Sequence, residues 1–134
     1  MDHIFSKAID KLKNKEPFVS DIEKDTADND DFFRVVYTGP DSQISLVSLK
    51  PKEDIGMESH PQDQFFRVED GEGECEINGE KYDIGAGMAV LIPGGAEHNV
   101  TNTSKFQELK LYIIYSPPKH EDGAFAEFKA DDKD

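Results

Sequence analysis

The chain has 134 residues, with 29 Asp and Glu against 15 Lys and Arg, and a formal net charge of -14 at pH 7. This acidity argues against nucleic acid and anionic membranes as partners, because both require a basic surface. No apolar run is long enough to span a bilayer, and the N-terminus lacks the basic-then-apolar pattern of a signal peptide. Cys75 is the only cysteine, so no intrachain disulfide can form. We therefore expect a one-domain cytoplasmic protein.

Residues 1–31 are predicted to form an N-terminal helix followed by an extended arm. Between residues 2 and 15, apolar side chains recur at helical spacing, and Pro17 ends the pattern. Residues 18–31 are mostly acidic and polar, which we interpret as an extended strand followed by a loop. In this arm Phe18, Val19 and Ile22 are candidates for pairing with a sheet edge or for a homodimer contact.

From Phe32 onward the apolar pattern has period two, which is typical of half-buried strands. The dipeptide Asn78-Gly79 is the strongest hairpin signal, and it predicts a type I′ turn. Short strands separated by Gly and Pro turns indicate an antiparallel sandwich or barrel over residues 32–118, followed by a partly ordered acidic tail over 119–134. The predicted strands cover residues 32–37, 43–49, 57–60, 64–68, 74–77, 81–84, 88–92, a strand starting at 98, and 108–115.

The stretch from residue 87 to 102 is the most informative part of the chain. It is predicted to form a strand, a tight turn and a second strand, because Pro93 fixes φ and Gly94 and Gly95 accept positive φ. His98 leaves this turn at the start of the second strand. Its position beside a polar turn makes it a candidate binding residue, although a histidine there can also simply cap the loop.

Five positions of this stretch match the second conserved motif of the cupin superfamily: Gly87, Pro93, Gly95, His98 and Asn102. An altered form of the first cupin motif lies upstream, where His60, Gln64 and Gly71 occupy the places of the second His, the Glu and the Gly. Glu58 stands where the family has its first His. The chain thus resembles small single-domain bacterial cupins, often labelled mannose-6-phosphate-isomerase-like. The resemblance implies an all-β jelly roll, or double-stranded β-helix barrel, here with a short N-terminal helix.

In cupins these four places line the mouth of the barrel and hold a divalent metal, so the resemblance implies a site of Glu58, His60, Gln64 and His98. Two imidazoles and a carboxylate suit Mn, Fe, Ni or Zn with open coordination positions. The substitutions in the first motif favour Mn or Fe over Zn, Cu and Ni. For each residue a plainer interpretation stays open: His60 and His98 as loop caps, Gln64 as a partner of a ligating histidine, and Glu58 as a solvated carboxylate.

The predicted function is a small metal-binding cupin. A metal-dependent isomerase, epimerase or dioxygenase acting on a small polar molecule is one hypothesis, and a non-catalytic sugar-like binding protein with a degenerate metal site is the alternative. A homodimer is expected from the resemblance. Arg67 and Lys110 are predicted to face outward, which argues against a phosphorylated substrate, Tyr115 to pack or to edge a pocket, and Cys75 to pack as an apolar side chain. His120 is assigned no role.

Overall fold

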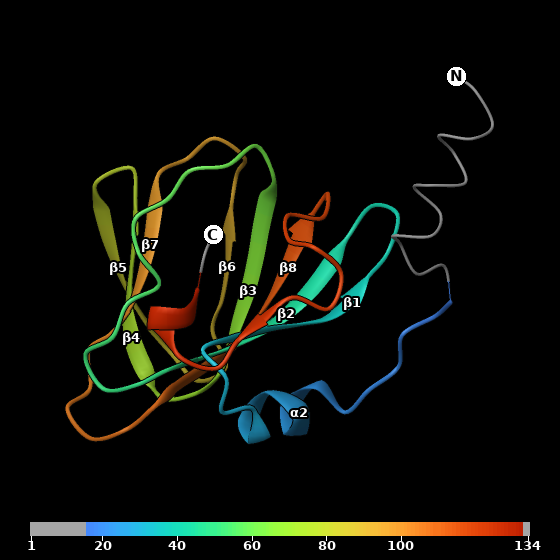
Figure 1. The fold of residues 1–134 in the computed structure, drawn as a ribbon. Helices are drawn as coiled ribbons and strands as arrows, with labels where there is room; N and C mark the ends of the chain where they lie inside the picture. The colour runs from blue at the N-terminus through green and yellow to red at the C-terminus, as the bar shows by residue number, and fades with distance from the viewer. Residues whose placement is uncertain (1–15, 133–134) are drawn as a thin grey trace.

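Two antiparallel sheets face each other in this computed structural model, which describes residues 16–132. Figure 1 shows the larger sheet beside the smaller one, with the chain passing repeatedly between them. The larger sheet has the order β6-β3-β8-β2-β1-β9, and the smaller has the order β5-β4-β7. This arrangement confirms the predicted all-β jelly roll. The strands are β1 Phe33–Thr38, β2 Gln43–Leu49, β3 Asp63–Asp70, β4 Glu72–Ile77, β5 Glu80–Gly85, β6 Ala89–Ile92, β7 His98–Asn102, β8 Leu109–Ser116 and β9 Phe125–Ala126.

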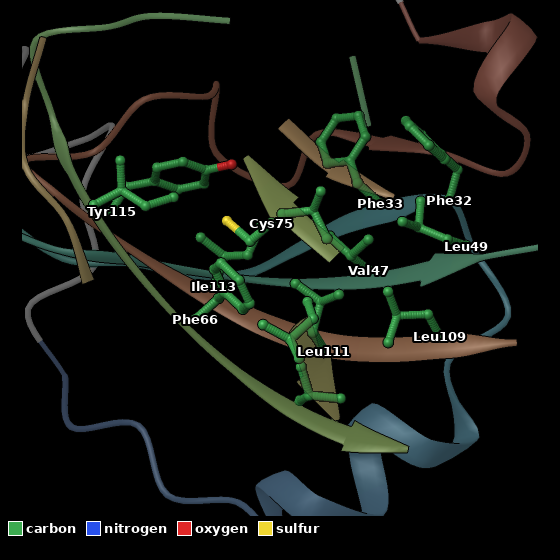
Figure 2. Close-up of a cluster of buried hydrophobic side chains, with 14 of the residues drawn as sticks. Phe32, Phe33, Val47, Leu49, Phe66, Cys75, Leu109, Leu111, Ile113 and Tyr115 are labelled. Carbon is green, nitrogen blue, oxygen red and sulfur yellow. The ribbon is translucent and has the colours of Figure 1, made fainter. Parts of the chain in front are cut away.

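The core fills the space between the sheets, and β8 illustrates how the sequence builds it. Its alternate residues Leu109, Leu111, Ile113 and Tyr115 are all buried, as the period-two pattern predicts. Figure 2 shows these side chains meeting those of neighbouring strands, including Phe66 of β3. Phe66 is fully buried. Each such side chain stabilises the fold by about 1.5–3 kcal/mol through removal of apolar surface from water.

Two turns have the backbone that the sequence requires. Asn78 and Gly79 have φ values of 49° and 85°, so the β4–β5 hairpin has the positive φ at both central residues that a type I′ turn needs. Gly71, which joins β3 to β4, has φ of 92°. A Cβ atom at Gly71 would lie 2.4 Å from the Glu108 carbonyl oxygen, so both conformation and space demand glycine there.

The arm before β1 differs from the prediction. Residues 22 to 28 form the helix α2 (Ile22–Asp28), not a strand at a sheet edge. Asp21 caps this helix by accepting a hydrogen bond from the Lys24 backbone N–H at 3.2 Å, and acidic residues in the first turn favour the helix dipole. The helix packs on β8 and β3, and Lys110 of β8 donates to the Asn29 carbonyl at its end. Lys110 thus points away from the core, as predicted, but is buried under α2.

One further expectation needs correction, and one lies outside the described residues. Residues 57 to 60 do not form a strand; only Glu58 makes a β-bridge, to His98. Within the tail predicted to be partly ordered, β9 pairs with β1 and a 3-10 turn follows at Lys129–Asp131. The predicted helix over residues 2–15 falls outside the described part of the chain. Within residues 16–132 no helix has the length and apolarity needed to cross a bilayer.

Replacing Gly71 with alanine tests the close packing of the β3–β4 turn. We expect Gly71→Ala to lower the free energy of unfolding by about 2–4 kcal/mol, because the methyl group meets a backbone carbonyl and the residue must keep a positive φ. Gly85→Ala is the matched control, since its Cβ would have no neighbour closer than 3.8 Å. Urea unfolding of the two variants should differ clearly, and equal stabilities would contradict this account.

Candidate functional site

The four predicted site residues come together at one end of the space between the sheets. Gln64 lies at the start of β3 in the larger sheet, and His98 at the start of β7 in the smaller one. Glu58 and His60 lie in the connection from β2 to β3. Glu58 and His98 exchange two backbone hydrogen bonds of 2.9 Å, which places their side chains next to each other.

The turn of the second motif holds His60 from the other side. Gly95 has φ of 89°, a conformation that favours glycine, and its N–H donates to the His60 carbonyl at 2.8 Å. The Gly94 N–H donates to Asp63 Oδ1 at 2.8 Å. The glycines of this turn therefore have a structural role, which is to hold the backbone of His60 in place.

Three ligand atoms meet in a small volume. The available atoms of Glu58, His60 and His98 lie within 4.8 Å of one another. Glu58 Oε1 is 3.6 Å from His60 Nε2 and 3.5 Å from His98 Nε2, and the two imidazole rings meet edge to face with centroids 4.9 Å apart. These separations exceed those of a good hydrogen bond, so the carboxylate oxygen faces both nitrogens across a gap.

Backbone carbonyls determine which nitrogen of each histidine carries the proton. His60 Nδ1 lies 3.1 Å from the Gln62 carbonyl oxygen, and His98 Nδ1 lies 2.9 Å from the Ala96 carbonyl oxygen. A carbonyl can only accept, so each Nδ1 carries a hydrogen and each neutral ring turns the lone pair of Nε2 toward the gap. This is the arrangement by which proteins orient metal-ligating histidines.

His98 Nε2 is buried and has no hydrogen-bond partner among the described residues. Gln64 Oε1 lies 3.0 Å from His60 Nε2, so two acceptor atoms face each other when that imidazole is neutral. Buried polar atoms left in this way are costly unless a proton or a metal ion sits between them. The residues present therefore fit a bound cation.

The charges at the site are set by burial and by neighbours. Burial acts to raise the pKa of Glu58, but His98, Lys119 and His60 outweigh it, and the pKa of that carboxyl lies below its usual value. Burial acts to lower the pKa of His98, but Glu58 and the Ala96 carbonyl outweigh it, and the pKa of that imidazole lies above its usual value. Glu58 is thus ionised at neutral pH, as a metal ligand must be.

Asn102, the last position of the second motif, has a structural role. It is fully buried, and its Nδ2 lies 3.0 Å from the Leu49 and Lys50 carbonyls and 2.8 Å from the Gln107 carbonyl. It joins three chain segments at the end of β7 remote from His98. Cys75 is likewise structural, because it is buried in the core and burial raises the pKa of its thiol to about 11.

A pocket adjoins the cluster, and two of its residues had no predicted role. Lys119 and His120 lie just after β8 and line this pocket together with Glu58 and Tyr115. Neither belongs to a motif. The only clue to them in the sequence is that they directly follow a strand whose last inward side chain is Tyr115. Many residues follow a strand in this way, so this clue does not identify a site. Arg67 and Lys110 are not among the residues that line it.

A pH titration of the metal-free protein tests the pairing of His98 with Glu58. Because the folded pKa of His98 lies above 6.5, this pairing stabilises the fold fully below pH 6.5 and is lost as the pH rises through the folded pKa. The difference in free energy of unfolding between chelator-treated wild type and His98→Gln should therefore shrink from about pH 5.5 to about pH 8.5, as urea unfolding would measure. A difference that does not change with pH would contradict the pairing.

Comparisons with known proteins agree with this geometry. Uncharacterized protein YrkC of Bacillus subtilis is 41% identical over 122 residues, covering 86% of this chain and 65% of YrkC. Uncharacterized protein L612 of Acanthamoeba polyphaga mimivirus is 40% identical over 111 residues, covering 79% of this chain and 69% of L612. The chain thus spans 65% of the length of YrkC, slightly less than two thirds, and 69% of the length of L612.

Structure and family comparisons point the same way. The crystal structure of BH2720 from Bacillus halodurans is similar with a TM-score of 0.84 and 43% identity, covering 87% of this chain and 93% of that one. A family model described as a cupin domain matches residues 45–115, more than half of the chain. The paired sheets, the convergent His and Glu side chains and this match have one explanation: the chain belongs to the cupin family.

Proposed function

We propose that this protein binds a divalent transition metal through Glu58, His60 and His98, with Gln64 as a fourth oxygen donor, and uses that centre to bind and transform a small molecule. The observation that carries the proposal is the buried, unpartnered Nε2 of His98, which faces a carboxylate oxygen and lies beside a second imidazole. A metal ion would satisfy all of these atoms at once.

The donor set supports particular metals. Two neutral imidazoles, one carboxylate and one amide oxygen suit Mn or Fe, and also Ni or Zn, with open positions for a further ligand. The carboxylate at position 58 restores the negative charge that Gln64 does not provide. Relative to a site with three histidines and a glutamate, a nitrogen donor is replaced by oxygen, which favours the harder ions Mn and Fe.

A metal bound here would supply Lewis acidity toward a carbonyl oxygen or, as iron, a place for dioxygen. The protein's own contribution is to fix both imidazoles through their Nδ1–H bonds and to keep one face of the cluster open to the adjoining pocket. We therefore favour an isomerase, epimerase or dioxygenase over a storage or scaffolding role. The substrate is a small molecule, because the pocket beside Glu58 is narrow.

A second candidate is a non-catalytic binding protein, and one observation favours it. Gln64 Oε1 lies against His60 Nε2 at 3.0 Å, so Gln64 can act as a hydrogen-bonding partner of that imidazole instead of a metal ligand. The two candidates differ in one measurable respect. A metal-loaded protein that binds small molecules but neither isomerises a carbonyl compound nor consumes dioxygen would favour the binding protein.

Replacing His98 tests the metal centre directly. His98→Ala should lower the affinity for Mn²⁺ by more than about 100-fold, because it removes a ligand and leaves the Glu58 carboxylate without its neighbour. His120→Ala is the matched control, since it removes an imidazole beside the pocket that lies outside the three-residue cluster. Metal analysis of protein purified without chelator or nickel resin would report occupancy. A wild type that ignores Mn²⁺, Fe²⁺, Ni²⁺ and Zn²⁺ would end the proposal.

The proposal extends to a cytoplasmic homodimer. Support comes from exposed apolar side chains, with exposed fractions of 91% for Val19, 63% for Leu91 and 90% for Phe106. Of these, Val19 lies in the arm predicted to supply the homodimer contact. Light scattering at micromolar concentration should give twice the mass of one chain, and Val19→Lys should shift the mass toward one chain. A monomeric wild type would contradict the dimer.

A further inference from the structure

The pocket beside the metal cluster has mostly apolar walls. Glu58 belongs to both the cluster and the pocket, so a molecule in the pocket reaches the carboxylate of the cluster. The free volume is about 30 Å³, so the pocket suits a small molecule. The apolar walls come from β1, β2, β8 and two connecting segments, through Phe32, Phe33, Val47, Ile55, Ile113 and Tyr115.

Lys119 is the one lysine among the residues that line this pocket, and no arginine lines it. It is half-buried, and its ammonium lies 5.9 Å from the centroid of the Tyr115 ring. Among residues 16–132, no carboxylate oxygen pairs with it within 4.0 Å. Among the described residues, the pocket therefore contains a cation that has no carboxylate partner.

Gln43 fixes the backbone that carries Lys119. Its side chain is fully buried at the start of β2, and its Oε1 accepts from the backbone N–H groups of Lys119 at 3.0 Å and His120 at 2.9 Å. Its Nε2 donates to the His120 carbonyl at 2.8 Å and to Thr38 Oγ1 at 2.9 Å. A buried amide with its bonds satisfied in this way holds one backbone conformation. Lys119 is thus positioned toward the pocket by the barrel itself.

The ring of His120 completes this wall. It stacks on Phe33 with centroids 4.9 Å apart and meets Tyr115 edge to face at 5.2 Å. Gln62 adds a second link, because its side chain donates to the Pro118 carbonyl at 3.2 Å while its own carbonyl faces His60 Nδ1. The segment bearing Lys119 and the segment bearing His60 are therefore joined by hydrogen bonds.

We propose that the pocket binds a short-chain organic carboxylate, with the carboxylate toward Lys119 and the metal cluster and the alkyl part against the apolar wall. The inference rests on the proposed metal centre. A divalent ion outweighs the charge of Glu58, and with Lys119 it keeps the pocket net positive even though Asp132 also lines it. A sugar would leave its hydroxyl groups unpaired against apolar walls, and a phosphate dianion would find a single ammonium.

The test compares an acid with its neutral isostere in the metal-loaded protein. Propionate and propionamide have almost the same shape, so a difference between their affinities reports the charge. Titrations of Zn²⁺-loaded, isotope-labelled protein followed by NMR should give tighter binding of propionate. Lys119→Met should weaken propionate about tenfold or more and leave propionamide unchanged. Hexanoate should bind less tightly than propionate because the pocket is small.

Lys105→Met is the matched control, because it makes the same change in net charge on an exposed residue far from the pocket. Lys105 follows the end of β7, whereas His98 lies at its start. It should leave the affinity for propionate unchanged. Equal affinities of wild type for acid and amide, or an unchanged affinity for propionate in Lys119→Met, would overturn the inference.

Zinc content measured in the same samples separates the two proposals. Loaded wild-type protein that does not bind propionate would overturn the carboxylate inference alone. Wild-type protein that takes up no metal would overturn both. Lys119→Met should retain zinc, because Lys119 lies outside the three-residue cluster.

Discussion

The structure depends on a set of hydrogen-bond acceptors that face one another at two buried imidazoles and a partly exposed carboxylate. Two imidazole nitrogens and one carboxylate oxygen surround a gap, and the side-chain oxygen of Gln64 lies against one of the imidazoles. Without a partner, buried acceptors of this kind cost about 1–3 kcal/mol each in folding free energy. The fold tolerates this cost because a cation can remove it, and the carbonyls behind each Nδ1 prevent the rings from turning away.

The way Glu58 reaches the site explains how an altered first motif remains compatible with a metal centre. Glu58 belongs to no strand. It is held by backbone pairing to His98, which lies in the smaller sheet. The carboxylate and the imidazole therefore enter the gap from paired residues. Moving the negative charge from position 64 to position 58 leaves it within reach of the same two histidines, at 3.5 and 3.6 Å.

The barrel could be predicted from sequence because its signals are local. Alternation along residues 109–115 identifies an inward face, and Asn78-Gly79 identifies a hairpin, both without knowledge of distant contacts. The helix α2 was missed because its seven residues are mostly polar, although Asp21 followed by an acidic first turn is a recognisable start signal. The order of β9 depends on pairing with β1, some ninety residues earlier, and no local pattern in the tail reports that pairing.

The metal cluster and the pocket also differ in how far the sequence predicts them. His60 and His98 could be singled out because they stand in motifs of fixed spacing. Lys119 and His120 have no such spacing. Their backbone is held beside the pocket by hydrogen bonds to Gln43, a residue that in sequence looks like an ordinary polar strand position.

The limits of the family match bear on this division. The matched region runs from residue 45 to residue 115 and contains every member of the metal cluster, whereas Phe33, Gln43, Lys119 and His120 all fall outside it. Under the two proposals, the metal ligands and the basic end of the pocket therefore lie in different stretches of the chain, although Val47, Ile113 and Tyr115 of the apolar wall lie inside the matched region. Substitutions in the flanking segments would then alter what the pocket accepts without changing a metal ligand.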